Sequence, residues 1–176
     1  VRVRTALLAA RRERDAAGSF WRATLGGPGK ATTEVTASVL VNVSGPWVKR
    51  VRDAINGAPS KENVRHVKGS HIVVPRVHDG EHAYILQNSD KRIVFVIPYQ
   101  DRYTLIGTTD VPVEAFEQPE ISPEEIDYLL ALANSYLAQR LTRKDVLWTF
   151  SGIRPLYDDG ASDPSAITRD YVFKLD

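Results

Sequence analysis

Cysteine and methionine are both absent from this chain of 176 residues. Without cysteine there can be no disulfide bond, no thiolate zinc site and no cysteine nucleophile. Hydrophobic runs such as residues 93–97 are far shorter than the roughly 20 residues that a membrane-spanning helix needs, and no signal-peptide pattern is visible. Because not even an initiator methionine is present, we expect the chain to be a fragment of a longer protein.

An excess of either charge is absent as well. Lys and Arg number 23 against 22 Asp and Glu, and 43% of the residues are hydrophobic, which is typical of a globular protein without a general affinity for nucleic acid. The length suits one ordinary domain or two small ones. Any recognition that depends on charge must therefore be local.

The N-terminal segment allows two interpretations. Residues 6–17 contain strong helix formers, whereas turn-forming residues at 15–19 and 26–29 divide the same part of the chain into strands. We favour the second interpretation, which is a β-meander over residues 1–37.

The next segment predicts a strand, a tight turn and a helix. Residues 39–43 (VLVNV) have the apolar run of a strand that is buried on both faces. A turn at Ser44-Gly45-Pro46-Trp47 should follow, since proline suits the first turn of a helix, and Asn56-Gly57 suits the end of that helix. A nucleotide is often bound at such a strand–turn–helix unit.

The remainder of the chain reads as an antiparallel sheet with one helix. A capping sequence, Ser122-Pro123-Glu124-Glu125, should begin this helix, which should end near Gln139. We expect a loop over residues 154–164. The expected strands are 72–74, 83–87, 93–97, 103–106, 146–150 and 168–175.

Three motifs suggest ligand sites that their spacing does not support. GGPGKAT (26–32) lacks the first glycine and the Ser or Thr of a phosphate loop, and the dinucleotide fingerprint G-x-G-x-x-G is absent. Asp158-Asp159-Gly160 with Asp163 lacks the spacing of an EF-hand and reads as a solvated turn. We therefore expect no metal site.

A set of basic residues gives a better indication of function. Lys68, His71, Arg154 and Arg169 lie at or near the ends of the predicted strands. Arginine binds phosphate or carboxylate through paired hydrogen bonds, and a neutral histidine can accept a proton near pH 7. Surface ion pairs, such as one between Arg154 and Asp158, are the explanation that the residues alone favour.

A family resemblance favours the ligand-binding interpretation. The segments VNVSGPWV, VKGSHIVVPRV, AYILQNSDKRIVFVIPY, LIGTTDV, SGIRPLYDDG and AITRDYVF resemble, in the same order, motifs of the bacterial FAD-dependent glycerol-3-phosphate dehydrogenases. The likeness is strong over residues 38–176 and weak over residues 1–37. One difference is Val43-Ser44, where the family usually has Ala-Thr, an exchange that keeps the hydroxyl group.

The resemblance implies an α/β (α+β) fold in two parts. Residues 1–65 would be a piece of the FAD-binding domain, containing the meander, the last strand and a helix. Residues 66–176 would form the substrate-binding domain, a mixed and largely antiparallel sheet packed with helices, whose face covers the flavin ring. The family's glycine fingerprint would lie upstream of Val1, so the isolated fragment should bind FAD poorly and be inactive.

The resemblance also implies roles for individual residues. His71 would be the catalytic base and Arg154 its catalytic partner, although these two roles could be reversed. Arg169 and Lys68 would bind the substrate. Residues that would approach the cofactor are Ser44, Gly45, Pro46 and Trp47. Asp110 could orient a residue of the pocket or stabilise a turn, and we favour the turn.

The implied reaction is the oxidation of sn-glycerol 3-phosphate to dihydroxyacetone phosphate, with hydride transfer to FAD. Electrons would pass on to a membrane quinone, so the parent protein should be cytoplasmic and peripheral at the inner face of the cytoplasmic membrane. It could form a homodimer. Two alternatives remain: an FAD-dependent amine or amino-acid oxidase of the same fold, and a non-catalytic module that binds a phosphorylated metabolite.

Overall fold

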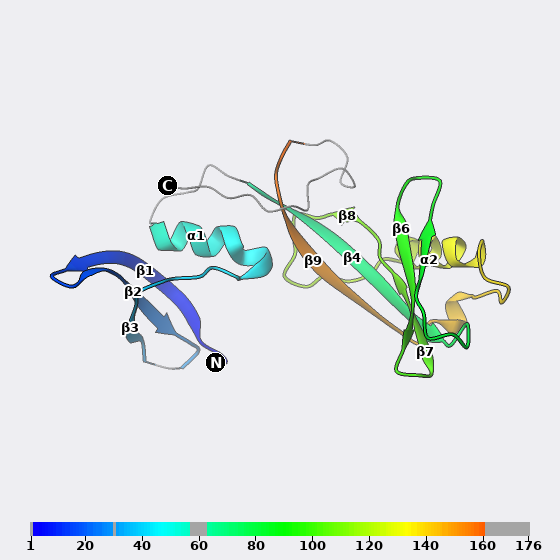
Figure 1. Cartoon of the computed structure of the whole chain (residues 1–176), viewed down its shortest axis with the longest axis horizontal. Coiled ribbons are helices and arrows are strands. Elements are labelled where there is room, and N and C mark those ends of the chain that lie inside the picture. Colours follow the sequence, from blue (N-terminus) through cyan, green and yellow to red (C-terminus); the bar gives the residue numbers. More distant parts are fainter. Residues whose placement is uncertain (1, 30, 57–62, 161–176) are drawn as a thin grey trace. The chain divides into compact units, whose positions relative to one another are not determined.

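The computed structural model describes residues 2–29, 31–56 and 63–160. These residues divide into two compact units, with the boundary between Val64 and Arg65. Each unit has its own sheet (Figure 1). Among the described residues, no helix has both the length and the hydrophobicity that crossing a membrane requires.

The first unit contains the predicted β-meander, coloured blue in Figure 1. Its strands are β1 (Ala6–Asp15), β2 (Gly18–Gly26) and β3 (Thr33–Ala37), paired antiparallel in that order. Ala10 of β1 lies opposite Ala23 of β2 and both are buried, so pairing and burial between strands outweigh the helix propensity of the alanine-rich segment. The favoured interpretation is confirmed.

The strand predicted at residues 39–43 is not formed. Val39, Val41 and Val43 are 70%, 70% and 85% exposed, and no strand of the described residues pairs with this segment. An apolar run becomes a strand only when a neighbour takes up its backbone hydrogen bonds, which explains the difference. The predicted helix is confirmed as α1 (Val48–Asn56), preceded by the 3₁₀ turn η1 (Gly45–Trp47).

The second unit is built on a six-stranded sheet in the order β5-β6-β7-β4-β8, with β9 also paired to β4. β4 pairs antiparallel with β7 and with β8, and β6 pairs antiparallel with β5 and with β7, as the sequence predicts. The strands are β4 (Val64–Pro75), β5 (Tyr84–Gln87), β6 (Ile93–Tyr99), β7 (Tyr103–Gly107), β8 (Val111–Pro112) and β9 (Trp148–Tyr157).

Two strands are longer than the sequence predicts. Lys68 and His71 lie within β4, and Arg154 lies within β9 instead of opening a loop, so none of the three stands at a strand end. Polar side chains interrupt an apolar pattern without ending a strand, provided that each face of the sheet offers them partners. Arg169 and the predicted strand 168–175 lie outside the described residues.

The helix α2 (Pro123–Asn134) lies beside the sheet, near β6 and β7 (Figure 1). Ser122 and Glu125 form the predicted capping box. The helix ends at Asn134 and not near Gln139, because the Asn134 side chain hydrogen-bonds the backbone of Leu141 in both directions and turns the chain. The core between helix and sheet consists of Ile72, Val74, Leu86, Val94, Val96, Ile106, Leu129, Leu130, Leu132, Ala133 and Leu141.

Candidate functional site

The alternation of side chains along β4 separates the residues of the KGSH motif. Lys68 and Ser70 point to the face covered by α2, where both contact Glu125. Gly69 and His71 belong to the opposite face, since successive residues of a strand point to opposite sides. The motif therefore contributes to two different environments, one buried beneath the helix and one on the open face of the sheet.

His71 lies on the open face against a glycine and an aromatic ring. Its partner in β7 is Gly107, where a Cβ atom would lie only 2.6 Å from His71 Cγ. Phe150 of β9 stacks on the imidazole with a centroid distance of 4.9 Å and an interplanar angle of 9°. The ring is thereby held between strands on both sides.

The environment of His71 favours its neutral form. Burial lowers the pKa of His71, and the positive charge of Arg154 lowers this pKa further. Its Nδ1 atom is buried and has no hydrogen-bond partner in the part of the chain that the structure describes. A neutral imidazole near pH 7 can accept a proton, which is the role that the resemblance assigns to it.

Arg154 is oriented by the segment that follows β7. Its Nη1 donates to Asp110 Oδ1 at 2.8 Å, and its Nη2 donates to Thr108 Oγ1 at 3.1 Å. A Cβ atom at Gly69 would lie 2.5 Å from both terminal guanidinium nitrogens, so this glycine leaves room for Arg154. Asp110 thus orients a residue of the site, which supports the interpretation that we did not favour from the sequence.

The predicted ion pair between Arg154 and Asp158 is not formed. Asp158 lies 3.5 Å from Arg65 instead, whereas Arg154 pairs with Asp110 at 2.8 Å. The Arg154 side chain is 31% exposed, so part of its cationic surface remains accessible to a ligand. The structure therefore brings His71 and Arg154 together on one face.

Apolar side chains surround these two residues on the open face. Phe95 of β6 is opposite Gly107, which is opposite His71, so the three share one row across the sheet. Phe95 and Phe150 are about 40% exposed, and Trp148 is 60% exposed. Among the described residues, this face thus offers exposed apolar surface beside a proton acceptor, His71, and a cation, Arg154, an arrangement that suits a planar aromatic group and a small anionic substrate.

Adding a methyl group at Gly107 should disturb the imidazole. In a Gly107→Ala variant the new Cβ would overlap the His71 ring, which is confined by Phe150. Overpacking of this kind costs about 1–3 kcal/mol. We expect a lower unfolding midpoint and a changed His71 titration by NMR, whereas Gly152→Ala, where nothing lies within 4 Å of the new Cβ, serves as the control. An unchanged His71 titration would contradict the proposed packing.

Lys68 lies on the other face, away from His71. Its Nζ is 2.8 Å from Glu125 Oε2 and donates to the Glu120 carbonyl at 2.6 Å, with 12% of the side chain exposed. The ammonium group therefore compensates a buried carboxylate. The role of Lys68 as a substrate ligand stays a prediction, because the structure does not bring it to the His71–Arg154 face.

Sequence reasoning identifies Glu125 only as a capping residue and misses its other contacts. The available signal was the spacing of three residues between Lys68 and His71 within one strand. An odd number of residues places the two side chains on opposite faces and implies a second polar site. Glu125 is 6% exposed. Burial alone would raise the pKa of Glu125, but hydrogen bonds from Lys68, Thr109, Ser122 and Ser70 outweigh burial and lower it below the usual 4.5.

The lowered pKa of Glu125 predicts a loss of stability in acid. A carboxylate with a lowered pKa in the folded state stabilises that state fully above the unfolded pKa, near 4.5, and this stabilisation is lost as the pH falls through the folded pKa. Thermal unfolding of the wild type should therefore be more sensitive to pH below 4.5 than that of Glu125→Gln. Equal pH dependence in both proteins would contradict this prediction.

The predicted cofactor residues Ser44, Gly45, Pro46 and Trp47 form a turn that Asn42 organises. The Ser44 hydroxyl donates to Asn42 Oδ1 at 2.6 Å, and Asn42 Nδ2 donates to the Val48 carbonyl at 2.8 Å. Gly45 has a φ of +57°, which favours glycine. A hollow of about 300 Å³ adjoins this turn and is lined by Leu7, Leu40, Val41, Asn42, Val43, Ser44, Val51 and Ile55. Contact of this turn with a cofactor stays a prediction.

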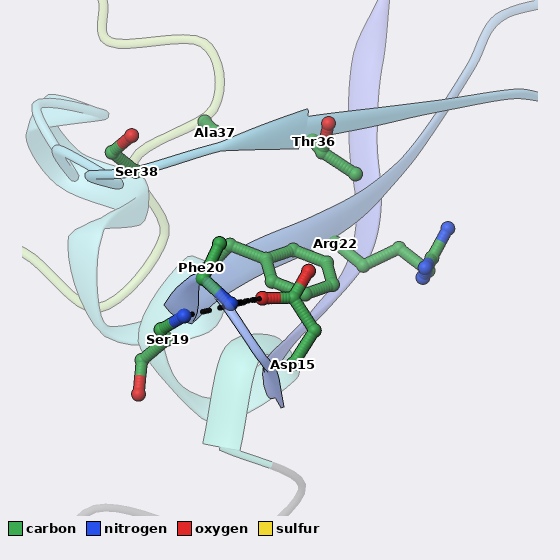
Figure 2. Close-up of a pocket in the computed structure, with 9 residues that line it drawn as sticks. Asp15, Ser19, Phe20, Arg22, Thr36, Ala37 and Ser38 are labelled. Carbon is green, nitrogen blue, oxygen red and sulfur yellow. Dashed lines mark hydrogen bonds between the residues drawn. The ribbon is translucent and has the colours of Figure 1, made fainter.

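A larger hollow of about 410 Å³ lies on the meander (Figure 2). The Asp15 carboxylate accepts hydrogen bonds from the backbone of Ala17 and Gly18, and Arg22 pairs with Glu13 and Glu34. These charged groups are thus engaged within the sheet, so the hollow carries no indication of a ligand. The described residues also contain no group of three or more His, Asp or Glu arranged to hold a metal ion.

Comparisons with known proteins identify the family of the chain. Residues 1–172 match the family described as "FAD dependent oxidoreductase". The chain is 46% identical over 174 residues to a D-erythritol 1-phosphate dehydrogenase of Brucella abortus (98% of this chain, 34% of the relative), and 52% identical over 137 residues to the aerobic glycerol-3-phosphate dehydrogenase of Escherichia coli (77% and 27%).

A solved structure shows the same fold. The glycerol-3-phosphate dehydrogenase of Bacillus halodurans, complexed with FAD, superimposes with a TM-score of 0.73 at 28% identity, covering 89% of this chain and 32% of that protein. The chain thus spans about a third of the length of the proteins that it matches.

Proposed function

Since the chain belongs to the family of FAD dependent oxidoreductases, we propose that the protein containing it oxidises sn-glycerol 3-phosphate to dihydroxyacetone phosphate and transfers hydride to FAD. The observation that carries this proposal is the placement of His71, with its lowered pKa, beside Arg154 on one open sheet face. The names of the relatives support the choice of a phosphorylated polyol as substrate.

The open face fits a flavin ring. Gly107 and Gly69 leave room for the His71 ring and the Arg154 guanidinium to lie against the sheet, and Phe95, Phe150 and Trp148 offer exposed apolar surface beside them. When bound, FAD would supply the hydride acceptor. The chain's own residues would exclude water from one side of the flavin ring and hold the substrate against that ring.

His71 would then act on the substrate hydroxyl. The proton of that hydroxyl passes to the imidazole while the carbon–hydrogen bond breaks and the carbonyl forms, so the hydride and the proton leave in different directions. Arg154 would stabilise the negative charge that develops on the oxygen. Its fixed position on Asp110 and Thr108 means that little reorganisation is needed during the reaction.

The remaining roles rest on the family resemblance. Arg169 would bind the phosphate dianion, to which a guanidinium is well suited, and Lys68 would do so only if it left Glu125. The backbone of Ser44, Gly45 and Pro46, with Trp47 beside it, would approach the cofactor. Electrons would continue to a membrane quinone, which implies attachment at the cytoplasmic membrane, and the protein could act as a homodimer.

D-Erythritol 1-phosphate is the second candidate substrate. The relative with this name is 46% identical over 98% of the chain, and its substrate shares a phosphate and a hydroxyl-bearing carbon chain with glycerol 3-phosphate. The same His71 and Arg154 chemistry would serve both. An amine or amino-acid oxidase is less well supported, because neither of these relatives is named for such a substrate.

Anaerobic reduction of the flavin tests the proposal. The whole protein should be purified with its flavin and mixed with sn-glycerol 3-phosphate, D-erythritol 1-phosphate or sarcosine. Bleaching of the flavin absorbance by glycerol phosphate is the expected result, and preference for erythritol phosphate would assign the second candidate. Bleaching by sarcosine alone would favour the oxidase. A protein that binds no added FAD would favour the non-catalytic module.

A further inference from the structure

The carboxylate of Glu125 lies directly behind the His71–Arg154 face. It accepts hydrogen bonds from the hydroxyls of Ser70 and Thr109, at 2.8 and 2.6 Å, and from the backbone of Ser122 at 2.8 Å. Lys68 Nζ lies 2.8 Å from its second oxygen. One buried side chain of α2 therefore contacts both β4 and the segment after β7.

The two residues that donate hydroxyl hydrogen bonds, Ser70 and Thr109, each adjoin a residue of the site on the open face. Ser70 precedes His71 in β4, so a shift of Ser70 moves the backbone that carries the imidazole. Thr109 lies between Thr108 and Asp110, which accept the two hydrogen bonds that orient Arg154. Glu125 thus contacts, from the α2 side of the sheet, the strand that carries the His71 imidazole and the segment that orients the Arg154 guanidinium.

The third strand of the site is connected in the same way. The Ser70 hydroxyl lies 2.8 Å from the Ser151 hydroxyl of β9. Ser151 follows Phe150, whose ring stacks on His71. The network beneath the sheet therefore reaches β4, β9 and the segment after β7.

Capping of α2 does not require this arrangement. The Ser122 hydroxyl already accepts the Glu125 backbone hydrogen bond, and the reciprocal bond from the Ser122 backbone involves only one carboxylate oxygen. The other oxygen, Oε1, accepts from Ser70 and Thr109. Burying a charged group is costly unless its partners are fixed, so these partners hold the two segments rigidly with respect to each other.

We propose that Glu125 is a positioning residue for the His71–Arg154 site, acting through Ser70 and Thr109, with Lys68 as its charge partner. The expected effect on the reaction rate rests on the proposed function. The expected effect on the position of Arg154 rests on the geometry alone. Displacement of catalytic groups by about 1 Å can cost about 100-fold in rate.

The link between Glu125 and Arg154 is tested most directly at Thr109. Thr109→Val removes the hydroxyl at nearly constant volume, whereas Thr109→Ser keeps it. In the whole protein we expect flavin reduction by sn-glycerol 3-phosphate to slow about 10- to 100-fold in Thr109→Val and to recover in Thr109→Ser. Glu125→Gln should resemble Thr109→Val, and Glu124→Gln, altered at the neighbouring position of the same helical turn, should resemble the wild type.

The His71 titration separates positioning from general stability. Among the described residues, Arg154 is the charged group that acts on His71, and it lowers the pKa of His71 while pairing with Asp110. If Thr109→Val displaces Arg154, the pKa of His71 should rise. This is measured by NMR of histidine-labelled protein, with His71→Ala identifying the resonance, at temperatures well below the unfolding midpoint.

The outcomes are distinct from those of the function test. A raised pKa of His71 in Thr109→Val, restored in Thr109→Ser, supports the positioning role even if glycerol phosphate does not reduce the flavin. A lower unfolding midpoint with unchanged reduction rate and unchanged His71 titration would overturn it and leave Glu125 as a purely structural group.

Discussion

Replacing His71 by alanine in the whole protein is expected to slow flavin reduction by sn-glycerol 3-phosphate by about 10²- to 10⁴-fold, the usual contribution of a positioned general base. His71 lies on the open face, stacked on Phe150 and lacking a partner for Nδ1 among the described residues. The rate constant of anaerobic bleaching, measured in a stopped-flow instrument at saturating substrate, gives the effect directly.

The pH dependence identifies which residue is the base. Because the pKa of His71 is lowered, its imidazole stays neutral to lower pH than an ordinary histidine, so the wild-type rate should fall only below about pH 6.5. This fall in rate at acidic pH, the acidic limb of the pH profile, should disappear in His71→Ala. Arg154→Ala should instead slow the reaction about 10²- to 10³-fold, as removal of a charge-stabilising donor does, and retain the limb.

His82→Ala is the matched control for His71→Ala. His82 belongs to the same unit but is exposed, and it stacks on His78 in the loop between β4 and β5. Its replacement should leave the reduction rate unchanged. Retention of full activity in His71→Ala would remove the histidine from the mechanism and transfer the role of base to another group.

The sequence predicts the local elements of the fold better than the pairing of its strands. Apolar periodicity and turn residues are local signals, and they correctly indicate the meander, the antiparallel sheet and the capping box of α2. Long-range pairing is not local. Residues 39–43 look like a strand but have no partner among the described residues, and β4 and β9 continue through polar residues because the faces of the sheet accommodate them.

The two faces of β4 show why the site could be predicted only in part. His71 and Arg154 are correctly grouped by their motifs, whereas Lys68 belongs to a separate buried network. The partners of that network, Glu125 and Thr109, are distant in sequence from Lys68. Only the register of the sheet and the packing of α2 bring them together.

Replacing Lys68 by methionine is expected to destabilise the protein by about 3–5 kcal/mol, because it leaves the Glu125 carboxylate buried without its cation. Glu125 and Lys68 are 7% and 12% exposed at their side chains, so water cannot easily substitute for the ammonium. The free energy of unfolding of the unit that contains Lys68, measured by denaturant titration, gives the effect.

Lys49 provides the matched control for Lys68. It pairs with Asp53 one turn away on α1 at the same N–O distance of 2.8 Å, but the two side chains are 35% and 29% exposed. Lys49→Met should therefore cost less than about 1 kcal/mol. The double variant Lys68→Met/Glu125→Gln removes both charges and should regain most of the stability that Lys68→Met loses.

The same variants decide whether Lys68 binds substrate. If its ammonium serves Glu125, Lys68→Met lowers stability and leaves the KM for sn-glycerol 3-phosphate nearly unchanged in the fraction that remains folded. If the ammonium group instead binds the phosphate, Lys68→Met raises KM steeply. The free energy of unfolding then changes little, because the ammonium group does not stabilise the buried network. The second result would contradict the ion pair as the main role of Lys68. The Lys68 side chain is 12% exposed on the sheet face that α2 covers, so it would have to leave Glu125 to reach the substrate.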